Sequence, residues 1–94
     1  MVERENLIID LLGNSSRLKI LLALWRSSEE LTPYKISRLT GLKRSSVRYH
    51  LKKLVDGGLI KRITYMDIPL FKINYDCEEG KAISEFFKKL AKRW

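Results

Sequence analysis

The chain has 94 residues, 45% of them hydrophobic, and its 19 lysines and arginines outweigh 11 acids to give a formal charge of +8. That length allows one domain with a single core, without a separate catalytic or ligand-binding lobe. The single cysteine, Cys77, excludes an intramolecular disulfide framework, and no apolar run approaches the roughly 18 residues of a membrane span. The first residues lack a secretory pattern, so we expect a soluble, cytoplasmic protein.

The positive charge is concentrated in one segment. Residues 32–54 hold seven of the 19 basic side chains and none of the 11 acids. Lysine and arginine gain affinity for nucleic acid by displacing the counterions condensed on its phosphates, so this segment indicates a polyanionic partner. The alternative is a merely solvated helix face, but such faces usually intersperse both signs of charge.

The first third of the chain predicts two helices. Apolar residues recur at helical spacing over about 3–12, and Gly13-Asn14-Ser15 ends that helix and offers a cap for the next. The second helix is marked by Leu18, Leu21, Leu22 and Trp25.

A helix-turn-helix pattern follows. Thr32-Pro33 is an N-cap followed by a proline at the first helical position, and it opens a third helix that runs to Thr40 and buries Ile36 and Leu39. Gly41-Leu42 forms the turn. A fourth helix over 44–56 then has an apolar side made of Val47, Leu51, Leu54 and Val55.

Beyond Gly58 the period of the pattern changes from 3.6 to 2. Two strands flank the turn Met66-Asp67-Ile68-Pro69, and a terminal helix over about 78–94 follows. The expected fold is mainly α with a β-hairpin, in the order ααααββα. Two short helices joined by a glycine turn and followed by a hairpin describe a winged helix-turn-helix in a single domain, 1–94.

Two stretches of the chain resemble ArsR-type winged-helix transcriptional regulators: NSSRLKILLALW and LTPYKISRLTGLKRSSVRYHLKKLVDGGLIKR. The family has a helix with the pattern Arg-Leu-x-Ile-Leu, which is matched here by Arg17, Leu18, Ile20 and Leu21. Its helix-turn-helix ends in His-Leu-x-x-Leu-x-x-x-Gly-Leu, which is matched by His50, Leu51, Leu54, Gly58 and Leu59. The resemblance implies a dimer that places one recognition helix of each subunit in successive major grooves of double-stranded DNA.

The fourth helix supplies the candidate base contacts, since an α-helix fits the major groove, arginine pairs with guanine and serine bonds to either base type. We expect base readout from Ser45, Ser46, Arg48 and Tyr49. Tyr49 has a second interpretation, because it can instead pack at the domain edge. We expect phosphate contacts from Tyr34, Lys35, Lys43, Arg44, Lys52, Lys53, Lys61 and Arg62.

The wing departs from the usual cationic tip. Its turn is apolar and carries Asp67, which repels DNA. Either the wing stays off the duplex and only residues near its base, such as Lys61 and Arg62, make contact, or the apolar tip serves another protein surface. We favour the first.

Metal sensing, the best-known ArsR activity, is not supported by this sequence. The third helix begins without cysteines, and residues 78–94 contain no histidine. We expect His50 to make a structural hydrogen bond, and Cys77 to be a small buried hydrophobe, with a redox link across a dimer as the alternative. We expect no metal, no cofactor and no enzymatic activity.

The terminal helices predict assembly. In ArsR-like proteins they form the dimer interface, here Leu7, Ile8, Leu11, Ile83, Phe86, Phe87, Leu90 and Trp94. The alternative is that both helices pack on their own core. For function, we favour a sequence-specific regulator that acts as a repressor; a nucleoid-type architectural protein and a protein-interaction winged helix are the alternatives.

Overall fold

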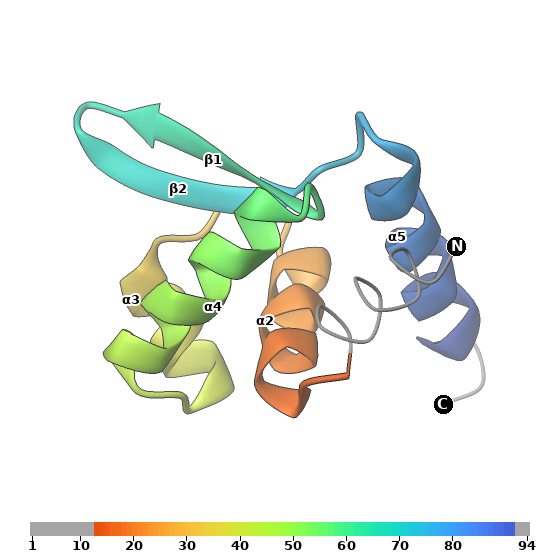
Figure 1. Ribbon diagram of the computed structural model, residues 1–94, viewed down its shortest axis with the longest axis horizontal. Coiled ribbons are helices and arrows are strands. Elements are labelled where there is room, and N and C mark those ends of the chain that lie inside the picture. The colour runs from red at the N-terminus through yellow and green to blue at the C-terminus, as the bar shows by residue number, and fades with distance from the viewer. Residues whose placement is uncertain (1–12, 92–94) are drawn as a thin grey trace.

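The computed structural model of the protein describes residues 13–91 (Figure 1). Within them the elements are α2 (Ser15–Arg26), α3 (Pro33–Thr40), α4 (Arg44–Asp56), β1 (Ile60–Tyr65), β2 (Ile68–Ile73) and α5 (Glu78–Ala91). This order confirms the predicted winged helix-turn-helix. The predicted first helix, with Leu7, Ile8 and Leu11, lies outside the described residues, as does Trp94. No helix in the described part of the chain is long and apolar enough to cross a membrane.

Local capping explains where the first helices begin and end. The side chain of Asn14 accepts a hydrogen bond from the Arg17 amide at the start of α2, and Thr32 accepts from the Lys35 amide at the start of α3. Gly41 ends α3 with φ of 77°, the left-handed conformation that glycine adopts without a Cβ clash. These caps lie at the positions that the sequence predicted.

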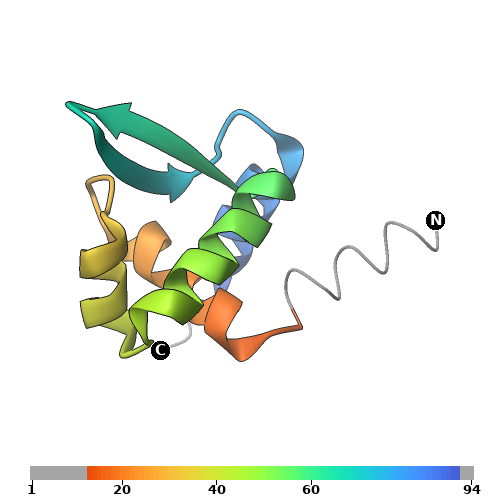
Figure 2. The same cartoon turned by 60° about the vertical axis from the view of Figure 1, so that its left-hand side comes forward.

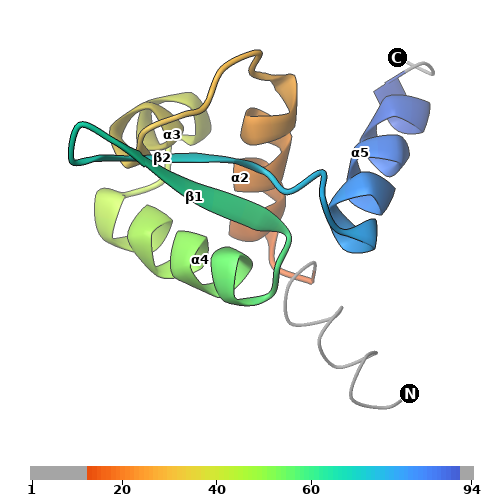
Figure 3. The ribbon, with the colours of Figure 1, turned by 90° about the horizontal axis from the view of Figure 1, so that it is seen from above.

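One hydrophobic core joins the elements, and α2 lies at its centre between the α3–α4 pair and α5 (Figures 1 and 3). Its buried side chains come from every described element and are Ile20, Leu21, Leu24, Leu31, Ile36, Val47, Leu51, Leu54, Leu59, Ile60, Phe71, Ile73, Ile83 and Phe87. One prediction about this core was wrong. Leu39 was expected on the buried side of α3 and is 64% exposed, because this eight-residue helix reaches the core through Ile36 alone.

The wing is a two-stranded antiparallel ribbon that projects from the helices (Figure 2). Tyr65 pairs with Ile68, so the turn consists of Met66 and Asp67 only and is two residues shorter than predicted. Both turn residues have positive φ, 51° and 66°, as a type I′ hairpin requires. The base of the wing is tied to the body by the paired backbone hydrogen bonds between Leu31 and Phe71, at 2.9 and 2.8 Å.

Helix α5 packs on α2 through one part of its apolar surface. Ile83 and Phe87 are buried, the Phe87 ring lies 5.6 Å from that of Trp25, and the Trp25 indole donates to the Ser84 hydroxyl at 3.2 Å. The single apolar stripe expected on this helix is therefore divided. Phe86 and Leu90 remain 54% and 37% exposed.

A polar junction fixes the start of α5. The Cys77 thiol donates to the Gly58 carbonyl at 3.1 Å and its sulfur accepts from the Gly80 amide at 3.3 Å, while the Asn74 side chain donates to the same Gly58 carbonyl. Gly80 lies so close to the Asn74 carbonyl that a Cβ there would be 1.7 Å from its oxygen. Cys77 is half-buried and makes these polar contacts at the start of the helix, so it is not the small buried hydrophobe that was expected from the sequence.

Candidate nucleic-acid interface

The outward face of α4 carries the predicted base-reading residues. Burial of Val47, Leu51 and Leu54 against the core orients this helix, and the opposite side exposes Ser45, Arg48, Tyr49 and Lys52. Ser46 lies at the edge of this face and is half-buried, unlike the four exposed residues. No carboxylate interrupts this face until Asp56 at the last turn.

Tyr49 does not pack into the domain edge. Its side chain is 57% exposed and makes an edge contact with the His50 ring, at 5.3 Å between centroids. The Lys53 ammonium lies 5.8 Å from the Tyr49 ring centroid, one turn along the helix. The phenol therefore stays available to a ligand, as its predicted role requires.

A stacked cluster joins α3 to the start of α4. The Arg44 guanidinium lies 4.9 Å from the centroid of the Tyr34 ring, and the Arg38 guanidinium lies 5.9 Å from it. Arg38 also donates to the Tyr34 hydroxyl at 3.1 Å. Sequence reasoning placed Tyr34 and Arg44 at phosphates but assigned no role to Arg38, although its spacing of four residues from Tyr34 on one helix was the available signal.

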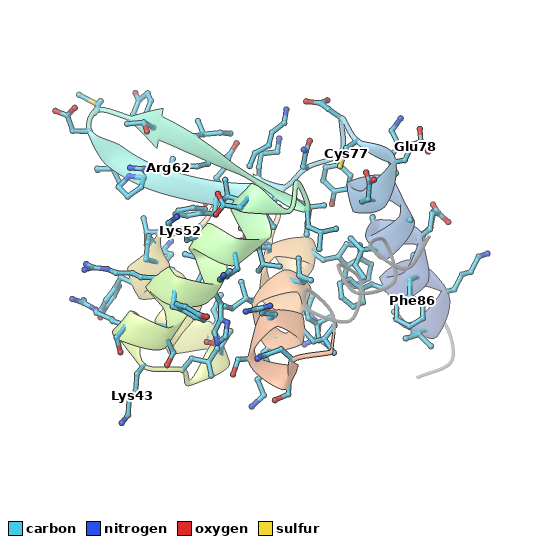
Figure 4. The ribbon with its side chains drawn as sticks, viewed as in Figure 1. Lys43, Lys52, Arg62, Cys77, Glu78 and Phe86 are labelled. Carbon is cyan, nitrogen blue, oxygen red and sulfur yellow. The ribbon has the colours of Figure 1, made fainter. Side chains whose placement is uncertain are left out.

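Cationic side chains run from the start of α4 to the wing. Lys43, Lys52 and Arg62 follow one another along this side of the molecule (Figure 4). They lie away from Cys77, which precedes α5, and from Glu78 and Phe86 on α5. Lys52 makes an exposed ion pair with Asp56 at 3.6 Å, which contributes little and leaves the charge accessible. Lys61 is bound to the Asp76 carboxylate, so its charge is partly neutralised.

The wing presents an apolar surface beyond its base. The register places Ile63, Tyr65, Ile68 and Leu70 on one face of the ribbon, and Met66 at the tip is 78% exposed. Arg62 lies on the other face, opposite Phe71. The basic side chains of the strands thus lie nearer the base of the wing than its tip.

His50 has a structural role. The Arg17 guanidinium Nε donates to His50 Nδ1 at 3.1 Å and so links α2 to the middle of α4, and Arg17 is 5% exposed. Burial and then the charge of Arg17 lower the pKa of His50 below its ordinary value of 6.5. The ring is therefore neutral at pH 7 and accepts this bond. The described residues contain no group of three or more histidine, cysteine, aspartate and glutamate side chains that could hold a metal ion.

Comparison with known proteins agrees with this geometry. A family model described as a helix-turn-helix domain matches residues 12–63, more than half of the chain. The chain belongs to this helix-turn-helix family. No curated protein matches it.

Solved structures extend the likeness of this helix-turn-helix protein beyond the matched segment. A predicted DNA-binding transcriptional regulator from E. coli is 27% identical, with a TM-score of 0.76 over 95% of this chain and 90% of that one. A homodimeric winged helix-turn-helix DNA-binding domain from Mycobacterium bovis, a possible ArsR-family regulator, is 21% identical with a TM-score of 0.76, over 97% and 81%. The transcriptional repressor PagR of Bacillus anthracis is 23% identical with a TM-score of 0.72, over 92% and 94%.

The winged-helix fold expected from the sequence is thereby confirmed. The family model covers α2, α3, α4 and most of β1, which are the elements that carry the basic segment. The structural neighbours extend the same fold through β2 and α5.

Proposed function

We propose that the protein is a sequence-specific, double-stranded DNA-binding transcriptional regulator, a dimeric repressor acting on cytoplasmic, nucleoid-associated DNA. The observation that carries this proposal is the outward face of α4, where Ser45, Arg48, Tyr49 and Lys52 are exposed together without a carboxylate among them. A face of this kind supplies donors for base edges and cations for phosphates from one helix. The relatives described as transcriptional regulators and as a repressor support the same proposal.

The proposed contacts divide into two groups. Ser45, Arg48 and Tyr49, with Ser46 at the flank, approach base edges in the major groove. The phosphate contacts come from the surrounding residues, which are Tyr34, Lys35, Lys43, Arg44, Lys52, Lys53, Lys61 and Arg62, and we add Arg38 because it shares the Tyr34 stack.

Dimerisation through α5 and the first helix supplies the second half-site. Phe86 and Leu90 are large apolar side chains left exposed on α5, whereas Ile83 and Phe87 already pack on α2. A two-fold dimer presents its recognition helices about one helical turn of DNA apart, which is the spacing of a palindromic operator.

Two alanine substitutions test the division between base and phosphate contacts. Arg48→Ala is expected to reduce the preference for an enriched duplex over random duplexes by about 1–3 kcal/mol. Lys53→Ala is expected to weaken both alike and to reduce the slope of log affinity against log salt by about one. Affinities from fluorescence anisotropy at several salt concentrations check this, and a uniform loss in both variants contradicts base readout by Arg48.

A further inference from the structure

His50 connects a buried arginine of α2 to an exposed tyrosine of α4. Its Nδ1 accepts the hydrogen bond from Nε of the buried Arg17, and its ring meets the Tyr49 ring edge-on, with 73° between the ring planes. Tyr49 lies among the exposed side chains on the outward face of α4. Three side chains in contact thus lead from α2, at the centre of the fold, to the face that carries the candidate base contacts.

The hydrogen bond from Arg17 orients the His50 ring. A neutral imidazole has one acceptor nitrogen and one N–H group, so acceptance at Nδ1 leaves the proton on Nε2. Turning the ring over would break the bond to a donor that lies in the interior. One orientation of the imidazole is therefore favoured.

The oriented ring supports the exposed Tyr49 side chain. A long side chain on a helix surface has several accessible rotamers, and fixing one of them when a ligand binds costs conformational entropy. The edge contact with His50 restricts Tyr49 before binding. A contact of this kind is worth about two- to tenfold in an equilibrium constant.

We propose that His50, held by Arg17, is a positioning residue that orients Tyr49 and so strengthens the preference of the outward face of α4 for particular base pairs. This role rests on the proposed function, in which Tyr49 approaches base edges. His50 acts through Tyr49 and not by touching a base.

The same contacts make the base preference depend on pH. Protonation of Nδ1 removes the lone pair that accepts from Arg17, whatever else Arg17 contacts, so the bond that orients the ring is lost. We therefore expect the preference to be full when His50 is neutral and to weaken when His50 is charged.

The surroundings of His50 determine where it becomes charged. Arg17 faces the ring from α2, and on α4 the Lys53 ammonium lies 5.8 Å from the centroid of the neighbouring Tyr49 ring. In the part of the chain that the structure describes, no carboxylate forms an ion pair with His50. Burial and then Arg17 lower the pKa of His50 from 6.5, so the ring gains its charge as the pH falls below about that value.

A ratio of two affinities tests the positioning role. Fluorescence anisotropy measures binding of the full chain to an enriched duplex and to random duplexes, at constant salt, from about pH 7.5 to about pH 5.5, the range in which histidine titrates. Partial unfolding and added positive charge change both affinities alike and cancel in the ratio. His50 is the only histidine of the chain, so no other imidazole contributes. The ratio is expected to fall by about two- to tenfold as His50 becomes charged.

Two alanine variants separate an effect through Tyr49 from a general distortion of α4. Tyr49→Ala removes the side chain through which His50 acts, so its ratio is expected to be lower than that of the wild type at neutral pH and constant with pH. Arg48→Ala, at an exposed position on the same face, is the matched control. Its ratio is expected to be lower but to keep the wild-type dependence on pH, because the contact between His50 and Tyr49 is intact.

A third variant removes the titration itself. His50→Asn keeps an acceptor oxygen for Arg17 but has neither the ring nor a titrating group, so its ratio is expected to be low and constant with pH. A wild-type ratio that does not change with pH, or an equal fall in Tyr49→Ala, would overturn the positioning role and leave the proposed function intact. Equal wild-type affinities for enriched and random duplexes at every pH would contradict the proposed function, and the role of His50 with it.

Discussion

At the scale of single residues, Tyr34 organises two arginines from different helices. Arg38 belongs to the same helix as Tyr34, whereas Arg44 stacks on the ring from α4, across the turn. In the proposed function, holding both guanidinium groups before DNA arrives reduces the side-chain entropy lost on binding. We therefore propose that Tyr34 positions these cations as well as making a contact of its own.

Tyr34 variants separate the ring from the hydroxyl. Tyr34→Leu removes the stack and the hydrogen bond to Arg38, and we expect it to lower duplex affinity by about two- to fivefold, the worth of one exposed cation–π contact. Tyr34→Phe keeps the ring, and we expect a smaller loss. Anisotropy titrations at one salt concentration check the order. Equal losses in the two variants would assign the effect to the hydroxyl, and no loss in either would contradict the positioning role.

His50 predicts a pH-dependent contribution to stability. The pKa of His50 is lower in the folded protein than in the unfolded chain. As the pH falls, the unfolded chain therefore binds the proton at a higher pH than the folded protein does, which favours unfolding. This contribution is therefore fully present above about pH 6.5 and is lost as the pH falls from there through the folded pKa. The thermal stability of the wild type is expected to fall over this window more than that of His50→Asn, because asparagine carries an acceptor oxygen at the position of Nδ1 but does not titrate. Parallel curves for the two proteins would contradict this account.

At the scale of elements, capping and periodicity allowed the helix-turn-helix to be predicted with its boundaries. Thr32-Pro33 and Gly41 set the start and the end of α3 through contacts with residues nearby in the chain, so these boundaries can be predicted from the sequence. The exposure of Leu39 could not be predicted from the sequence, because it depends on which other elements pack against the end of α3. The contact between Tyr34 and Arg44 escaped prediction for the same reason: it forms only when the turn brings two helices together.

The hairpin and α5 show the same limit. Alternation identified both strands. It did not identify the two-residue turn, because in that turn Met66 and Asp67 have positive φ, a conformation that glycine adopts more readily than either residue. On α5, periodicity grouped Ile83, Phe86 and Phe87 on one stripe. Only the contact with Trp25 on α2 shows that the stripe is divided between core and surface.

Gly80 tests how α5 is attached. Gly80→Ala places a Cβ against the Asn74 carbonyl, so the start of α5 must move, and we expect a loss of about 1–3 kcal/mol in the free energy of unfolding. Chemical denaturation at a fixed protein concentration measures it. The neighbouring Glu79→Ala, at an exposed position, is the control and should stay within about 0.5 kcal/mol. A tolerated alanine at position 80 would show that the junction is adaptable.

At the scale of the whole molecule, two surfaces have distinct chemistry. The outward side of α4 is basic and polar, and the exposed part of α5 is apolar. A small domain has one core to stabilise it, so side chains left outside that core are free to serve separate partners. In the proposed function, DNA and a second subunit use these two separate surfaces.

Assembly is tested on the exposed part of α5. The double substitution Phe86→Ser and Leu90→Ser is expected to convert a dimer into a monomer at micromolar concentration, because it removes the apolar side chains not used by the core. Multi-angle light scattering gives the mass, and circular dichroism checks that the fold is kept. Tyr65→Ser, on the equally exposed wing, should remain dimeric. A wild-type monomer, or a dimer that survives the double substitution, would contradict this interface.

The central claim is that the outward face of α4 reads DNA sequence. The most direct measurement is to enrich bound duplexes from a random pool and then to compare the affinity for the enriched duplex with that for random duplexes at the same salt concentration. A sequence-specific regulator is expected to bind the enriched duplex at least about 10³-fold more tightly. Similar affinities for both would indicate an architectural protein that binds by charge alone, and no detectable duplex binding at low salt would contradict a DNA-reading function altogether.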